Sequence, residues 1–128
     1  MARLIVEACS AEWTGVDIVY TLLVAVSVSR ADDGKAVTGL KAENFHVASH
    51  IGSVKDFKVG AVSEWKWEPA NVEPSGCYQV EISMTTAVKF LKGQRYIFGI
   101  QAQTFGETGK RQVIDQGQTV FELTSLGE

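Results

Sequence analysis

A segment of two-residue alternation between positions 18 and 29 places the strongest constraint on the fold. Apolar side chains at every second position predict one buried face of a β-strand: Ile18, Tyr20, Leu22, Val24, Val26 and Val28. The intervening side chains become smaller and more polar toward Ser29, which is typical of a strand face that approaches solvent. β-Branched residues crowd the segment and disfavour a helix. The segment therefore predicts a strand in a half-buried sheet.

Turn residues and further alternating segments follow this strand. Asp32-Asp33-Gly34 predicts a tight turn, because Asp and Gly stabilise turn geometry locally, and Thr38-Gly39 predicts a second turn. More apolar faces are expected on the segments around Leu4, Phe45–Val47, Phe57–Val59, Tyr78–Met84, Tyr96–Ala102 and Gln118–Leu123. About seven to nine strands with frequent turn signals predict an all-β, antiparallel β-sandwich. Nothing in the chain indicates a repeat or a linker, so residues 1–128 are expected to form a single domain.

Three segments are less regular. Ala61–Trp67 is expected to pair with the strand before it across Gly60. Pro69 and Pro74 are expected to bracket an irregular loop, since proline cannot donate a ladder hydrogen bond. Trp13 is expected in a loop that precedes the alternating strand.

Charge and hydropathy limit the classes of partner. The chain has 12 basic and 15 acidic residues, a net charge of −3, and lacks the basic patch that nucleic-acid binding requires. Its longest apolar region, residues 18–28, falls well short of the roughly 20 residues that a membrane helix needs. The apolar run after Met1 is too short for a signal peptide. The chain as written is expected to be cytoplasmic, or exported with its export segment removed.

Cysteine and histidine spacing argues against a metal site. Cys9 and Cys77 form no C-x-x-C pair, and spacing alone leaves open whether they form a disulfide. His46 and His50 are four residues apart on an extended segment, about 13 Å end to end, so one ion is not expected to reach both. Phosphate- and dinucleotide-binding motifs are also missing from the sequence, so no cofactor and no catalytic residue are predicted.

Three motifs carry a resemblance to a known class of domain. Residues 33–45 read D-G-K-A-V-T-G-L-K-A-E-N-F, residues 76–80 read G-C-Y-Q-V, and residues 93–98 read G-Q-R-Y-I-F. This pattern resembles the turn and strand junctions of bacterial immunoglobulin-like and prealbumin-like β-sandwich domains. The resemblance implies an immunoglobulin-like sandwich, and it carries no catalytic residue with it, because such domains serve as spacers, adhesion modules and binders of protein or carbohydrate.

The tryptophans are the candidate ligand-binding residues. Trp65 and Trp67 are two apart on an expected strand, so their rings are predicted to share one face, either in the core or as an exposed platform. Trp13 is predicted to join such a patch or to cap the core. The leading hypothesis is a non-enzymatic module for protein binding or self-association, through exposed edge strands or an aromatic patch. The alternative is a carbohydrate-binding module that uses Trp13, Trp65 and Trp67.

Overall fold

The computed structural model describes residues 2–16, 19–49, 57–67, 73–84, 95–106 and 109–124. Nearly all of this backbone is β-strand, with one short 3-10 helix, η1 (Ala42–Asn44). The strands are β1 (Ala2–Val16), β2 (Val19–Arg30), β3 (Phe45–Ser49), β4 (Phe57–Trp67), β5 (Glu73–Met84), β6 (Arg95–Gly106) and β7 (Gly109–Thr124). The prediction of an all-β protein is confirmed.

The seven strands form one mixed sheet in the order β3-β6-β7-β1-β2-β5-β4. Five of the pairings are antiparallel, but β1 and β7 pair in parallel at Ala2↔Asp115 and Arg3↔Gln116. The prediction of a wholly antiparallel sheet is therefore wrong at this pairing. The physical reason is that β1 pairs with two strands, with β7 at Ala2 and Arg3 and with β2 from Leu4 onward.

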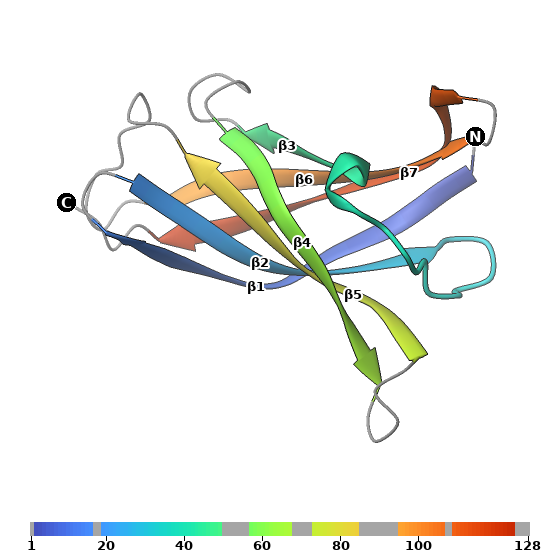
Figure 1. The fold of residues 1–128 in the computed structure, drawn as a ribbon, viewed down its shortest axis with the longest axis horizontal. Coiled ribbons are helices and arrows are strands. Elements are labelled where there is room, and N and C mark those ends of the chain that lie inside the picture. The colour runs from blue at the N-terminus through green and yellow to red at the C-terminus, as the bar shows by residue number, and fades with distance from the viewer. Residues whose placement is uncertain are drawn as a thin grey trace.

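The sheet curls until it is nearly barrel-shaped, and its core lies inside the curl. In Figure 1, β4 and β5 cross over the hairpin of β6 and β7. Aromatic rings meet across the interior, with Phe57 of β4 against Phe98 of β6 at 5.6 Å between ring centroids, and Phe45 of β3 against Tyr78 of β5 at 5.5 Å. These contacts join the two ends of the strand order without pairing their backbones.

The two-residue alternation correctly predicted the core. All four predicted inward residues of β2 whose side chains are described are buried, as are those of β5 and β6, whereas Val59 of β4 is partly buried. The buried apolar set is Leu4, Val6, Leu22, Val24, Val26, Val28, Val37, Phe45, Val47, Phe57, Tyr78, Val80, Ile82, Phe98, Ile100 and Ala102. The predicted positions Ile18, Tyr20, Met84 and Tyr96 have side chains outside the described part of the structure.

Three expectations about strand boundaries are wrong. Phe57–Trp67 is one strand, because Gly60 lies in a bulge between Val59 and Val62 and does not reverse the chain. Trp13 belongs to β1, which continues to Val16 because it pairs with β2 from Leu4 to Val16, with Trp13 opposite Leu22. Pro74 lies within β5, at its end, opposite Lys66.

The segment between β2 and β3 is held by side chains from distant strands. Its first turn is the one predicted, with Gly34 at φ 73° and the Lys35 N–H donating to Asp33 Oδ1 at 2.9 Å. Farther along, the Tyr78 hydroxyl donates to the Val37 carbonyl at 2.6 Å and accepts from the Leu40 N–H at 3.2 Å. This hydroxyl thereby satisfies two backbone groups of the loop, which is also bridged to β2 at Ser29↔Ala36.

Within the residues that the structure describes, no helix has the length and apolar character needed to cross a membrane.

Candidate functional site

One surface of the sheet combines apolar side chains, amides and a groove. We call it the outer face, and it consists of the outward-pointing residues of β1, β7 and β6: Arg3, Ile5, Glu7, Ile97, Gln101, Gln103, Ile114, Gln116, Gln118, Val120 and Glu122. Sequence alternation creates it, because these residues interleave with core residues on the same strands. On β1, for example, Arg3, Ile5 and Glu7 are exposed while Leu4 and Val6 are buried.

Four large aliphatic side chains stay exposed on this face. Ile5 is 40% exposed, Ile97 50%, Ile114 41% and Val120 59%. Ile97 and Val120 are diagonal neighbours, because Ile97 pairs with Glu122 and Val120 pairs with Gly99. Single exposed apolar residues are ordinary, but a group on one sheet face indicates a binding surface. The outer face is therefore the strongest candidate for recognition.

A groove runs along the junction of β1 and β7. Its cavity volume is about 480 Å³, and it is lined by residues 3–7 of β1, residues 116–118 of β7 and Gln101 of β6. Gly117 lets the two strands approach, because a Cβ at this position would overlap the carbonyl oxygen of Leu4. The groove thus lies where β1 leaves β7 to pair with β2.

Glutamine amides cover the centre of the outer face. Gln101 pairs with Gln118 and Gln103 with Gln116 in the β6–β7 register, and Gln103 Nε2 lies 3.4 Å from Gln116 Oε1. Each amide offers donors and an acceptor, so the row can bond to peptide groups or to other amides of a partner. The amides at this centre can therefore bind a partner and orient it.

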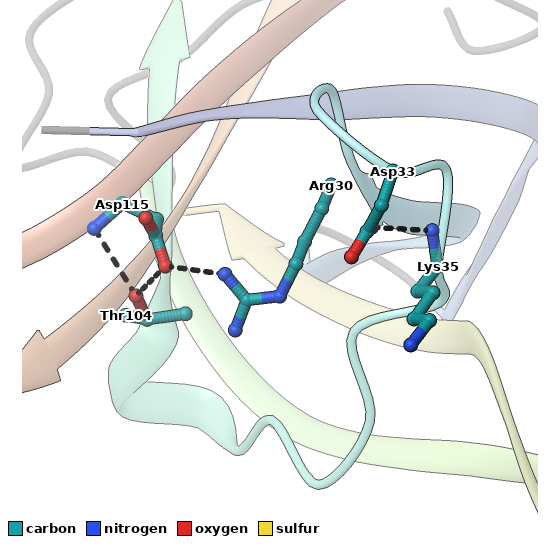
Figure 2. Close-up of polar contacts among 5 residues, drawn as sticks. All are labelled: Arg30, Asp33, Lys35, Thr104 and Asp115. Carbon is teal, nitrogen blue, oxygen red and sulfur yellow. Dashed lines mark hydrogen bonds and ion pairs between the residues drawn. The ribbon is translucent and has the colours of Figure 1, made fainter.

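A buried carboxylate fixes the strands directly beneath this face. Asp115 is 3% exposed, and its Oδ2 accepts from Arg30 Nη1 and from Thr104 Oγ1, each at 3.0 Å. Thr104 Oγ1 also accepts the Asp115 N–H at 3.1 Å. Figure 2 shows Arg30 reaching Asp115 from the end of β2, beside the Asp33–Lys35 turn. These bonds tie β2, β6 and β7 together beneath the outer face.

The structure describes one of the three tryptophan side chains predicted as a site. Trp65 is 52% exposed on β4, as an exposed platform would require. Trp13 lies on β1, which is separated from β4 by β2 and β5 in the sheet, and the side chains of Trp13 and Trp67 fall outside the described residues. The prediction of a tryptophan platform therefore stays a prediction with Trp65 as its described member.

Glu64 of β4 bonds to backbone groups of two other segments. Its two carboxylate oxygens accept the Gly39 N–H at 2.9 Å and the Gly76 N–H at 3.0 Å. The side chain is half-buried and points at the loop that follows β2, so it has a structural role in joining that loop to β5.

His46 lies exposed on β3, and His50 lies outside the described residues. Within the described ranges, no three His, Cys, Asp or Glu side chains are grouped so as to hold a metal ion.

The cysteines are not bridged in this fold. Cys77 is a free thiol on β5, half-buried. Its strand is separated from the β1 strand of Cys9 by β2, which puts the two backbones about 9 to 10 Å apart. A disulfide needs a Cα separation below about 7 Å, so the register excludes the bond.

Sequence reasoning missed most of this site. Residues 109–117 were not expected to be strand, so Asp115 and Gly117 carried no prediction. A signal was present: the inward alternation of Phe121 and Thr119, carried back along the chain, puts Gly117 and Asp115 on the core side.

Comparisons with known proteins found no relative of this chain. No protein-family model, no curated protein and no solved structure matches this chain.

Proposed function

We propose that the chain is a non-enzymatic, immunoglobulin-like β-sandwich module that binds a protein partner through its outer face. The strand order supports the fold part of this proposal. Dividing the sheet within β1 gives β1, β2, β5 and β4 on one side and β7, β6 and β3 on the other. The immunoglobulin constant-type arrangement, ABED against GFC, has this same chain order when its strands are lettered in sequence.

The observation that carries the functional part is the exposure of Ile5, Ile97 and Val120 on one face, at 40%, 50% and 59%. A protein partner that covers such aliphatic side chains gains binding free energy from burying apolar surface, and the amides beside them supply directional hydrogen bonds. The groove between β1 and β7 adds the shape into which a partner side chain fits.

The edge strands are less suited to accept a partner strand. β4 carries the exposed lysines Lys58 and Lys66 and two register shifts, and β3 has five residues. Lysines, bulges and short length are the features that protect sheet edges from pairing with another chain. The outer face is therefore favoured over the edge strands, which were one of the two routes to assembly predicted from the sequence.

Photo-crosslinking tests the proposed function. Val120 is replaced by benzoylphenylalanine in cells of the source organism, and we expect irradiation to give a discrete protein adduct. Ser63, exposed on β4 far along the sheet, is the matched control and is expected to give none. Equal adduct yields at the two positions, or no adduct at Val120, would contradict the proposal.

The exposure of Trp65 favours carbohydrate binding as a second candidate function. An exposed indole ring stacks on the apolar face of a sugar. If this candidate holds, a glycan from a panel will shift the tryptophan emission of the wild type and leave that of Trp65→Phe unchanged. An identical response in both proteins, or none in the wild type, would remove this candidate.

A further inference from the structure

We propose that the partner of the outer face is a second copy of this chain, packed face to face about a two-fold axis that passes beside Ile5. The inference rests on the proposed function, because it takes the outer face to be the binding surface, and it names the occupant of that surface.

The outward row of β1 is complementary to itself. Arg3, Ile5 and Glu7 are all exposed on one side of the strand, with opposite charges equally spaced about the apolar centre. When a second copy lies antiparallel over this row, Ile5 meets Ile5, and Arg3 meets Glu7 of the second copy at both ends, about 13 Å apart. A parallel alignment would instead bring like charges together, so the charges select the two-fold arrangement.

The neighbouring strands extend the same symmetry. Arg3 is level with Gln116, and two residues farther along these parallel strands Ile5 and Gln118 both line the groove. Gln118 pairs with Gln101, and Gln101 with His46, so the row through the axis consists of Ile5, two amides and an imidazole. An amide group both donates and accepts hydrogen bonds, so it can pair with an identical amide. Such a row can therefore bond to its symmetry copy.

Apolar side chains flank that row on both sides. Ile97 and Val120 lie on one side of the Gln101–Gln118 pair, and Ile114 lies on the other. A two-fold axis along the row exchanges the two sides, which brings aliphatic groups from opposite ends of the face into one interface. A stable interface of this kind buries about 1,200 to 2,000 Å² in total, so β6 and β7 must contribute beyond the β1 row.

The contact closes on itself. Both copies use the same patch, so association stops at two, in contrast to growth through a sheet edge. The lysines and bulges of β4 act against edge growth.

Charge reversal with sedimentation velocity tests the inference. The full chain is expected to sediment as a monomer–dimer equilibrium. Arg3→Glu and Glu7→Arg each place like charges at both ends of the row, and each is expected to weaken dimerisation roughly tenfold or more. The variant with both reversals restores complementarity, and its dissociation constant is expected to return to within about threefold of the wild type.

Two exposed residues away from the face supply matched controls. Lys66→Glu changes the net charge as Arg3→Glu does, and Asp32→Arg changes it as Glu7→Arg does, and both are expected to leave dimerisation unchanged. Circular dichroism and thermal midpoints verify that every variant folds, and Ile5→Asp, which is expected to be monomeric, replaces a reversal that does not fold.

A chain that is monomeric at all concentrations, or a double reversal that stays as weak as the single ones, overturns the inference. The proposed function fails separately. A Val120 adduct with a different protein, together with a monomeric chain, leaves the binding face in place and removes the second copy as its partner.

Discussion

Replacing Gly117 by alanine is expected to lower the free energy of unfolding by about 3 kcal/mol or more. The new Cβ would occupy the space of the Leu4 carbonyl oxygen, a backbone atom that moves only if β1 moves. Leu4 is itself 2% exposed, so shifting it disturbs the core as well as the β1–β7 junction. Urea denaturation monitored by circular dichroism measures the loss.

Gly60→Ala is the control for this substitution. The three atoms nearest to its new Cβ would all belong to the side chain of Glu81, with Oε1 at 2.8 Å, and that flexible carboxylate can turn away. We expect Gly60→Ala to cost less than about 1 kcal/mol. Equal losses of unfolding free energy in the two variants would show that the packing of β1 does not require a glycine at position 117.

Tyr78→Phe is expected to destabilise the protein by about 1 to 3 kcal/mol at neutral pH and to change its response to alkali. The substitution leaves the Val37 carbonyl and the Leu40 N–H without the hydroxyl that bonds to both. Burial raises the pKa of Tyr78 to about 12 from its ordinary value of 10.0. Tyr78 is fully buried on β5, so the ionised form is disfavoured in the folded state.

The sign of the pH dependence follows from this shift. Between pH 10 and pH 12 the unfolded chain releases the Tyr78 proton more readily than the folded chain, so the free energy of unfolding falls as the pH rises. The contribution is complete below pH 10 and is lost as the pH rises through the folded-state pKa. Urea titrations from pH 8 to about 12 are expected to show this alkaline loss in the wild type and a smaller one in Tyr78→Phe. Parallel profiles for the two proteins would mean that Tyr78 ionises equally in both states.

The sequence predicted the core of this protein better than its surface. Alternation at Leu22–Val28, at Val80–Ile82 and at Phe98–Ala102 is a local property, and a buried sheet face requires it directly. The register is different, because it depends on which strands meet. Nothing in the residues around Ala2 indicates that they pair in parallel with Asp115 and its neighbour.

The difference between local alternation and register also explains why the candidate site was not predicted. Ile5, Gln101 and Gln118 are ordinary outward positions of three separate strands, and they become one surface through the β6–β7 hairpin and the β1–β7 junction. The tryptophans were predicted as ligand-binding residues because they are rare and large. Their placement depended on strand boundaries that local patterns predicted poorly, as the extent of β1 through Trp13 shows.

The parallel junction of β1 with β7 also has a mechanical meaning. Tension applied between Ala2 and Thr124 pulls these two strands lengthwise in opposite directions, so their hydrogen bonds are loaded together in shear and do not open one at a time. The anchored residue at this junction is Asp115, whose carboxylate is bonded to Arg30 and Thr104. A load carried by β7 at this junction is therefore shared with β2 and β6 through the bonds of Asp115.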